Sequence, residues 1–302
     1  MILIITHKED YTSDFIINKL NQRKIKYKRL NCEDLINSNF KVDKDLNFSI
    51  DGINLFNSVW FRRTKLPDIN SSNPQEDIYL LNEYETLLKN LFCTIDAKWF
   101  SDPFKIYKAE NKLYQLKIAK NIGFIIPNTL ITNNKETLKE FYFLNSKEII
   151  IKPLSQSKLN NKGETEFIFT NDLKNEHIEK LDEYELTPCI YQEKIQKSIE
   201  LRVTVVGEKI FTSGINSQLF ENTKTDWRKG KQEFFKETIP LDVEEKCKLI
   251  VKKLGLRFGA IDLIKDTNGN YVFLEINPNG QWAWIENETG LKISDAIINE
   301  LI

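Results

Sequence analysis

The first hundred residues alternate short apolar runs with stretches of helical spacing. Four runs have the length and composition of β-strands: Met1–Thr6, Tyr27–Leu30, Leu46–Ile50 and Asn57–Phe61. Ser13–Arg23 carries apolar residues at helical spacing, and strands that alternate with a helix indicate a small α/β layer. A second helical stripe, Gln75–Ile95, is interpreted as a bridging or dimer-forming helix.

Two arginines follow the last of these strands. Arg62 and Arg63 stand just beyond the run SVWF, where ligands of open α/β sheets usually lie. They are candidates for substrate contact, and an ordinary pair of surface arginines is the alternative.

The remaining two hundred residues begin with a predicted boundary, because Pro103 biases Asp102 towards an extended conformation. The pattern then predicts helices at Ile106–Asn121, Val243–Leu254 and Ile285–Ile302, and strands at Glu148–Pro153, Leu201–Val206 and Lys209–Ser213. Gly123 is expected to end the first of these helices. The pair Gly207-Glu208, with glycine first, predicts a type II′ hairpin turn.

Two further apolar runs, Phe258–Ile264 and Tyr271–Ile276, are predicted strands joined by an Asp-Thr-Asn-Gly turn. Asp262 lies in the first run and Glu275 in the second, and Asn277 shares a strand face with Glu275 because side chains two apart point the same way. If the strands pair, Asp262 reaches the same side. Two carboxylates and an amide oxygen suit Mg²⁺, whereas solvated ends of edge strands are the alternative.

Composition excludes several other classes of protein. The 302 residues have room for two or three domains, and 43 Lys+Arg against 44 Asp+Glu leave no bulk field to attract nucleic acid or an anionic membrane. The apolar start MILIIT is too short for a signal peptide, and no run approaches a membrane-spanning helix. Four isolated cysteines and two histidines disfavour a zinc site and indicate a reduced, cytoplasmic protein. P-loop and Rossmann glycine motifs are absent.

The C-terminal hairpin also resembles a known family. A strand with Asp262 followed by Glu-x-Asn-Pro resembles the metal-binding signature of ATP-grasp ligases, and the longer text FLEINPNGQW resembles the graspetide ligases of the microviridin and grasp-with-spasm types. The resemblance covers nearly the whole chain and is strongest from Glu200 to Trp284. It implies an α/β (α+β) ATP-grasp fold with an N-terminal pre-ATP-grasp α/β domain at 1–100, a central lid subdomain at 101–190 and a C-terminal subdomain with the metal ligands at 191–302.

The resemblance implies where ATP binds. Lys112 and Lys152 would approach the nucleotide, with Lys152 on its phosphates, and the polar segment 155–163 would close over the triphosphate. The adenine-binding hinge would comprise Gln192, Glu193, Lys194 and Ile195. A solvated lysine on a helix is the alternative for Lys112.

Further positions follow from the same resemblance. Glu200 would take the ribose hydroxyls and Arg202 would lie near the γ-phosphate, with a cross-strand ion pair as the alternative for either. The text TDWR recurs in graspetide ligases at the edge of the catalytic cleft. Arg228 is able to clamp a carboxylate or acyl-phosphate oxygen bidentately, and an ordinary charged loop is its alternative. Lys152, Arg202 and Arg228 are therefore the expected catalytic cations, while Asn277 is expected to contact both metal and nucleotide.

Together these features predict an ATP- and Mg²⁺-dependent peptide macrocyclase. The resemblance implies a ribosomal precursor peptide whose Asp or Glu side chains are phosphorylated and then captured by Ser, Thr or Lys. Two alternatives stay open: an untethered ligase that adds an amino acid to a peptide or protein, and a regulatory ATP-binding protein without turnover. The complete set of Asp262, Glu275 and Asn277 argues against the regulatory protein.

Overall fold

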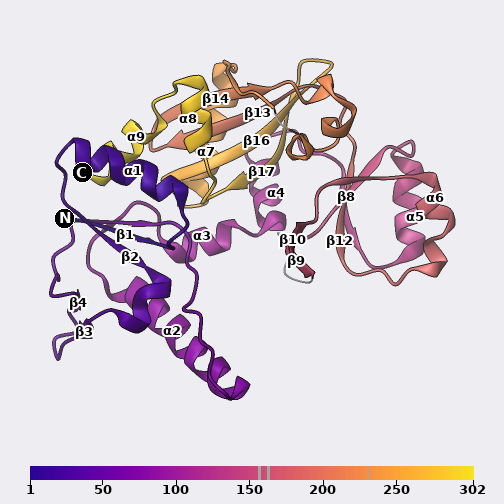
Figure 1. Ribbon diagram of the computed structural model, residues 1–302. Helices are drawn as coiled ribbons and strands as arrows, with labels where there is room; N and C mark the ends of the chain where they lie inside the picture. Colours follow the sequence, from indigo (N-terminus) through magenta and orange to yellow (C-terminus); the bar gives the residue numbers. More distant parts are fainter. Residues whose placement is uncertain (156–157, 162–163, 231) are drawn as a thin grey trace.

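The chain folds around three main sheets in a computed structural model, which describes residues 1–155, 158–161, 164–230 and 232–302. For 158–161 and 164–167 only the backbone is described. Figure 1 shows the N-terminal sheet on one side, the C-terminal sheet above it and the central sheet standing apart on the other side. Chain order and sheet membership give the mixed α/β fold that the sequence predicted.

The N-terminal sheet is parallel, with strand order β2-β1-β5-β6. Its strands are β1 (Ile2–Thr6), β2 (Tyr27–Asn31), β5 (Ser58–Phe61) and β6 (Lys98–Trp99). Along β1, Leu3 and Ile5 enter one hydrophobic core and Ile2 and Ile4 enter another. Such burial on both faces is what a parallel sheet requires, and it explains why this run is apolar throughout.

The predicted strand at Leu46–Ile50 is shorter and lies outside this sheet. Leu46 has a φ of 61° and takes part in a turn, so β4 begins at Phe48 and pairs only with β3 in a separate hairpin. The elements here are helix α1 (Tyr11–Gln22), 3₁₀ helix η1 (Cys32–Asn37), β3 (Phe40–Val42) and β4 (Phe48–Ile50). The turn arises because Asp43 accepts hydrogen bonds from the backbone N–H groups of Asp45 and Asn47.

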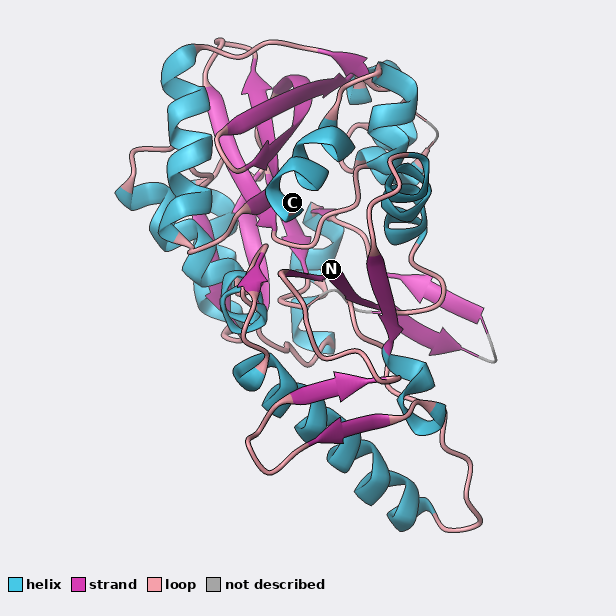
Figure 2. Ribbon diagram, turned by 90° about the vertical axis from the view of Figure 1, so that its left-hand side faces the viewer, coloured by secondary structure: helices cyan, strands magenta, loops and turns pink. Residues whose placement is uncertain are grey.

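Helix α2 (Pro74–Thr94) matches the predicted helical stripe. Its C-terminal part packs on the core through Leu88, Leu91 and Phe92, whereas Ile78 and Tyr79 are exposed. Figures 1 and 2 show the N-terminal part of α2 extending beyond the rest of the molecule. A role of this helix in forming a dimer remains a prediction.

The central sheet has strand order β11-β8-β12-β7 and is antiparallel throughout. This part of the chain contains β7 (Thr129–Thr132), α5 (Lys135–Leu144), β8 (Ile149–Lys152), β9 (Lys158–Asn161), β10 (Glu164–Phe167), β11 (Asn171–Leu173), α6 (Asn175–Glu179), η2 (Leu181–Glu183) and β12 (Cys189–Glu193). Its own small core joins α5 and α6 to the sheet through Leu138, Ile178 and Tyr191. A core of its own lets this sheet stand apart from the other two.

The C-terminal sheet is a five-stranded antiparallel sheet of order β15-β14-β13-β16-β17. The elements are β13 (Lys197–Val206), β14 (Lys209–Ile215), η3 (Ser217–Leu219), η4 (Glu221–Thr223), η5 (Trp227–Lys229), β15 (Phe235–Lys236), α7 (Leu241–Lys253), β16 (Phe258–Asp266) and β17 (Tyr271–Asn277). Gly207 turns the chain between β13 and β14 with a φ of 58°, as the predicted two-residue turn requires. Gly269 does the same between β16 and β17 with a φ of 85°.

Two predicted helices are each broken into two. The stretch Ile106–Asn121 divides into α3 (Pro103–Ala109) and α4 (Lys112–Asn121), because Asn111 is extended and its side chain caps α4 by accepting from the N–H of Tyr114. The stretch Ile285–Ile302 divides into α8 (Ala283–Thr289) and α9 (Ile293–Leu301) at Gly290, whose φ of 68° ends α8. Both predictions of a single helix were wrong because the apolar period continues through a capping residue.

The first and last hundred residues share their cores. One core contains Leu3 and Val59 together with Val203 and Ile261, and a second contains Ile4 and Trp60 together with Phe258. The division into domains at 1–100, 101–190 and 191–302 therefore remains a prediction.

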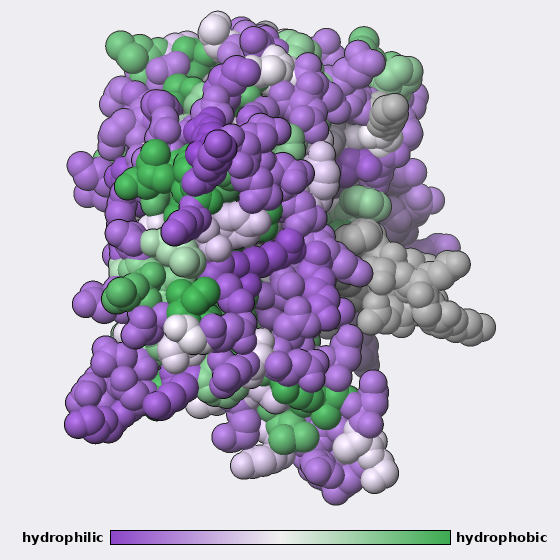
Figure 3. Space-filling view, turned by 60° about the vertical axis from the view of Figure 1, so that its left-hand side comes forward, coloured by the Kyte–Doolittle hydropathy of each residue, from purple (hydrophilic) through white to green (hydrophobic). Residues whose placement is uncertain are grey.

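The outer surface is mostly hydrophilic on the face in Figure 3, where hydrophobic side chains form separate patches. No helix within the described ranges is long and apolar enough to cross a membrane.

Candidate functional site

A cleft lies between the central and C-terminal sheets, and we call it the main cleft. Its empty space, with the open mouth included, is about 1210 Å³. The residues that the resemblance implied for ATP, the metal and catalysis all line it: Lys112, Lys152, Gln192, Glu193, Lys194, Ile195, Glu200, Arg202, Arg228, Asp262, Glu275 and Asn277. Arg62 and Arg63, the candidates for substrate contact, do not line it and belong to a second cleft instead. The fold therefore brings together side chains from Lys112 to Asn277, which are far apart in the sequence. Their individual roles remain proposals.

The acidic end of the main cleft lies on β16 and β17. Asp262 is the direct cross-strand partner of Glu275, and a register irregularity follows this pair. Upstream on the same face of β16, Phe258 and Ala260 lie in the core that contains α8 and α9. Asp262, the next residue on this face, is not part of that core and lines the main cleft instead. The prediction that the two acids reach one side is confirmed.

Burial and the neighbouring Glu275 charge raise the pKa of Asp262 to about 6, although Arg202 acts in the opposite direction. Burial also acts to raise the pKa of Glu275. The charges of nearby cations, of which Lys152 has the largest effect, outweigh burial, so the pKa of Glu275 is lowered. Two carboxylates side by side in a half-buried cleft thus repel one another, and a cation shared between them would relieve this repulsion.

Arg202 holds Asp262 from the neighbouring strand. The two residues are register partners on β13 and β16, and the guanidinium donates two hydrogen bonds to the carboxylate, Nη2 to Oδ2 at 3.3 Å. The cross-strand ion pair considered for Arg202 is therefore present, and its partner is one of the candidate metal ligands. Glu200, on the same strand face, instead accepts from Lys197 Nζ at 2.8 Å.

Two lysines approach the acids from other elements. Lys112, the first residue of α4, donates to the carbonyl oxygen of Pro153 at 3.3 Å, and its Nζ lies 3.9 Å from Glu275 Oε2. Lys152 ends β8 and makes no hydrogen bond or ion pair with any described residue. Burial lowers the pKa of Lys152 to about 8, against the attraction of Glu275. A buried, unpaired ammonium is costly, so Lys152 lacks a negative partner in this structure.

The segment Gln192–Ile195 leaves the central sheet at the inner wall of the main cleft. The backbone N–H of Lys194 donates to Glu148, whereas the N–H of Ile195 has no partner among the described residues. Gln192 is fully buried; its Nε2 donates to Thr129 Oγ1 at 2.8 Å and its Oε1 has no partner. A backbone N–H without a partner at the wall of a cleft is a donor available to a ligand.

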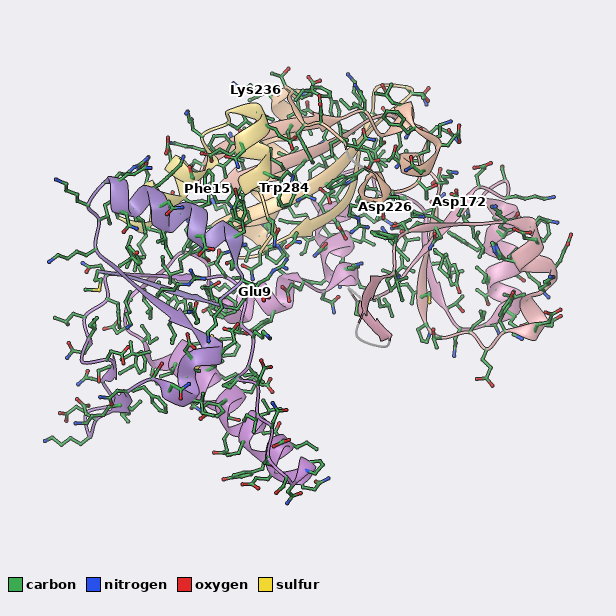
Figure 4. All side chains as sticks on the ribbon, viewed as in Figure 1. Glu9, Phe15, Asp172, Asp226, Lys236 and Trp284 are labelled. Atoms are coloured by element: carbon green, nitrogen blue, oxygen red, sulfur yellow. The ribbon has the colours of Figure 1, made fainter. Side chains whose placement is uncertain are left out.

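Arg228 stands at the mouth of the main cleft on η5. Its guanidinium grips Asp226 with two hydrogen bonds, Nε to Oδ1 at 2.8 Å, and lies over the ring of Phe169 at 5.7 Å. The hydrogen bond to Asp226 raises the pKa of Arg228. Figure 4 shows Asp226 and Asp172 on either side of the region where the C-terminal and central parts meet. The loop is anchored there, because Thr225 donates to Asp172 at 2.8 Å and the N–H of Thr170 donates to Asp226 at 3.2 Å.

Sequence reasoning missed a buried glutamine that links two of these elements. Gln115 on α4 donates to the carbonyl oxygen of Ile276 at 2.8 Å and accepts from its N–H at 3.0 Å. It thereby fixes β17 between Glu275 and Asn277. A polar residue on a helix carries no sign of such a partner, and only the low exposure of Gln115, 3%, reveals it.

In the segment 155–163, expected to cover the triphosphate, positions 156–157 and 162–163 lie outside the described residues, and only the backbone is described for 158–161. Only Ser155, at the edge of the main cleft, is placed with its side chain.

The acidic end of the main cleft fits a divalent cation of the Mg²⁺ type. It offers two adjacent carboxylates and the amide of Asn277, all hard oxygen donors. The described residues contain no cluster of three or more His, Cys, Asp and Glu side chains suited to a metal.

Solved structures that resemble the whole chain include two related enzymes. The macrocyclase MdnC from Microcystis aeruginosa, bound with precursor peptide MdnA, is 28% identical with a TM-score of 0.88, and 100% of this chain and 99% of that chain are covered. A RiPP-associated ATP-grasp ligase from Chryseobacterium gregarium, in complex with ADP and a leader and core peptide, is 28% identical with a TM-score of 0.89, and 99% and 96% are covered.

A curated relative is the alpha-aminoadipate–LysW ligase LysX of Sulfurisphaera tokodaii. It is 23% identical over 226 residues, which cover 71% of this chain and 75% of the relative. No protein-family model matches the chain.

The fold and these similarities define the protein as an ATP-grasp ligase. Within this class its similarity is to RiPP ATP-grasp macrocyclases, as the text FLEINPNGQW indicated.

Proposed function

We propose that this ligase is a graspetide synthetase, a peptide macrocyclase that links acidic side chains of a ribosomal precursor peptide to its own Ser, Thr or Lys side chains. The observation that carries the proposal is the main cleft: it gathers the acids of β16 and β17, the cations Lys152, Arg202 and Arg228 and the Gln192–Ile195 wall in one space. The solved macrocyclases that resemble the chain over its full length support it.

ATP occupies the main cleft in this proposal. The backbone near Glu193 to Ile195, where the N–H of Ile195 has no partner among the described residues, binds the adenine edge, with Gln192 buried in the wall behind it. Glu200 binds the ribose hydroxyls. Lys152 supplies the positive charge for the phosphates, since it is the cleft lysine without a partner among the described residues. Lys112 supports it from α4.

Asp262, Glu275 and Asn277 hold Mg²⁺ in this proposal. The bound metal would neutralise phosphate charge and stabilise the transferring phosphoryl group. Arg202 orients Asp262 through its two hydrogen bonds and adds positive charge beside the transferred group. Arg228, which Asp226 holds in place, adds a further positive charge at the mouth of the main cleft.

The proposed reaction has two nucleophilic displacement steps. A side-chain carboxylate oxygen of the peptide attacks the γ-phosphorus, so that an acyl phosphate forms and ADP leaves. A hydroxyl or amine of the same peptide then attacks the acyl carbon and loses its proton. The bond between the acyl carbon and the phosphate oxygen breaks, and phosphate leaves with the electron pair. The product is an ester or amide ring. Because the nucleophile is tethered, its effective concentration exceeds that of a free amino acid.

The experiment is mass spectrometry of the precursor peptide after incubation with the protein, ATP and Mg²⁺. The peptide is the product of a short Thr/Ser- and Asp/Glu-rich reading frame sought beside this gene. Each ring removes one water, so mass losses in steps of about 18 Da are expected while ATP is hydrolysed, as the stoichiometry of intramolecular condensation demands.

A second candidate function is ligation of a free amino acid to a peptide or protein, which the similarity to the LysX ligase favours. It would raise the mass of the peptide instead of lowering it. A mass gain without dehydrated peptide overturns the macrocyclase proposal and leaves the ATP-grasp ligase standing. An unchanged mass without ATP hydrolysis would favour a regulatory ATP-binding protein.

A further inference from the structure

A second cleft adjoins the main cleft at the acidic end and has about 1360 Å³ of empty space. Its walls are the segment after β5, the junction of α3 and α4, and the strand end from Glu275 to Asn279. Lys112, Ser155, Glu275 and Asn277 line both clefts. The two spaces therefore meet at the candidate metal ligands, with the adenine wall at one end and Arg63 at the other.

The cations of the two clefts differ in whether they have partners. Arg202 and Arg228 hold Asp262 and Asp226 in the main cleft, and Arg62, in the wall of the second cleft, is buried beside Asp10. Lys112, Lys194 and Lys197 each lie near a carboxylate as well. Among the described cations of both clefts, Lys152 and Arg63 alone have neither a hydrogen bond nor an ion pair.

Arg63 is half-buried and has no anion at contact distance among the described residues. Burial and the adjacent Arg62 charge both act to lower its pKa, with Asp10 and Glu110 opposing them. Glu110 lines the same cleft, and burial raises the pKa of its carboxyl while Arg63 lowers it. The two charges sense one another without forming an ion pair among the described contacts. A guanidinium offers a carboxylate two parallel N–H donors, so an arginine without a partner in a cleft is suited to bind a carboxylate ligand.

The position of Arg63 is fixed by its neighbour. Arg62 donates to Asp10 Oδ2 at 3.3 Å and to the carbonyl oxygen of Asn279 at 3.3 Å, so the segment that carries Arg63 is tied to the loop after Asn277. Arg63 lines the same cleft as the candidate metal ligands Glu275 and Asn277 but does not line the main cleft, so an anion bound to it would leave the nucleotide side free.

We infer that Arg63 is the binding residue for the acidic side chain of the peptide that is about to be phosphorylated, with the second cleft as the peptide's subsite. This inference rests on the proposed function. A carboxylate that approaches a polyphosphate is repelled, and Arg63 offsets this repulsion on the side away from ATP. The walls also carry Tyr107 and Leu154, which suit the apolar part of a Glu side chain.

The test uses two small probes of equal shape. N-acetyl-glutamic acid α-amide carries the side-chain carboxylate, and N-acetyl-glutamine α-amide is its neutral isostere. Saturation-transfer NMR on the protein saturated with Mg²⁺ and ADP measures their binding. We expect the wild type to bind the acid at least about tenfold more tightly than the amide, and Arg63→Gln to lose that preference, because one charge-assisted bidentate contact is removed.

Lys65→Ala is the matched control, because Lys65 is an exposed cation two residues away whose only described partner is Asp68. It should bind the acid as the wild type does. Unchanged ADP affinity in Arg63→Gln shows that the variant is folded, and Arg63→Lys should restore part of the preference. Equal binding of acid and amide by the wild type, or an undiminished preference in Arg63→Gln, would overturn the inference.

The experiments distinguish a failure of the Arg63 assignment from a failure of the macrocyclase proposal. Binding of the acid through Arg63, with no dehydration of the precursor peptide, defeats the macrocyclase proposal alone. Dehydration of the peptide by Arg63→Gln at the wild-type KM defeats the Arg63 assignment alone.

Discussion

At the scale of single residues, the main cleft is a set of charges that are only partly balanced. Asp262 is paired with Arg202. Among the described residues, Glu275 has only Lys112, at 3.9 Å, and Lys152 has no hydrogen-bond or ion-pair partner. Burial makes such incomplete pairing costly. The cleft is therefore arranged for charges that arrive with a ligand, a cation at the acids and an anion at the lysine.

Glu275→Gln tests the acidic end. The amide keeps the shape of the side chain and loses its charge, so we expect turnover to fall by about 100-fold or more, as loss of a metal-stabilised phosphoryl group implies. The measurement is ATP hydrolysis at saturating Mg²⁺, with circular dichroism to verify the fold. Glu208→Gln, in the exposed β13–β14 turn, is the matched control. A folded Glu275→Gln protein with the wild-type rate would contradict the metal assignment.

Lys152 predicts a pH dependence of nucleotide binding. Its pKa is lowered to about 8 in the empty cleft, and phosphates favour the charged form, so the pKa rises on binding. Affinity for ADP should be constant below about pH 8 and fall above it, by up to about tenfold per pH unit. Calorimetric titration from about pH 7 to about pH 9.5 measures the slope.

The control for this prediction is Lys152→Arg, which stays charged over the whole range and should show a flatter profile. Lys152→Ala should bind ADP weakly at every pH. A wild-type affinity that does not change with pH, or a Lys152→Ala protein that binds ADP normally, would contradict the assignment of Lys152 to the phosphates.

At the scale of elements, helix α4 and strand β17 act as one unit. Gln115 donates to the carbonyl oxygens of Ala109 and Ile276 and accepts from the N–H of Ile276. The helix start that carries Lys112 is thereby fixed to the strand end that carries Glu275 and Asn277. Precise placement of charges from two elements requires such a supporting contact.

Gln115→Met tests this link. Methionine fills the same volume but leaves three buried backbone groups without partners, so we expect the free energy of unfolding to fall by about 2–4 kcal/mol. Urea denaturation measures the change. Gln22→Met, an exposed position at the end of α1, is the control and should cost little. Equal stability of the two variants would show that the Gln115 contacts contribute nothing.

At the scale of the whole molecule, the N-terminal layer and the C-terminal sheet form one body around the acids. Arg62 is 1% exposed and connects Asp10, after β1, to the carbonyl oxygens of Asn279 and Gly280, after β17. Asp10 also accepts from Thr6 and Ser13 and from the N–H of Thr12 at the start of α1. The Arg62 charge helps to hold the pKa of Asp10 well below its usual range against the effect of burial.

Removal of this arginine should therefore destabilise the protein as a whole. Arg62→Met leaves the buried Asp10 charge uncompensated, and we expect a loss of about 3–5 kcal/mol. Adding Asp10→Asn removes the charge and keeps the helix cap, so the double variant should recover part of the loss. Thermal unfolding of the two variants provides the comparison. A double variant no more stable than Arg62→Met would contradict the ion-pair explanation.

The sequence by itself determined the local chemistry of this protein. The acids stand out because charge inside apolar strand runs is costly, and Gly207 and Gly269 mark hairpins because their positive φ suits glycine. Side-chain alternation along a strand then places Glu275 with Asn277. Strand pairing confirms that Asp262 joins them.

Only the tertiary structure decided which groups meet over long distances. Gln115 and Ile276 are 161 positions apart and Arg62 and Asn279 are 217 apart, and neither contact follows from a local pattern. The breaks at Asn111 and Gly290 also escaped the helical period, although both are local, because a capping side chain or a left-handed glycine ends a helix without interrupting the apolar spacing. Periodicity reports which face of an element is buried, whereas the partner of a polar side chain depends on what the rest of the chain places against it.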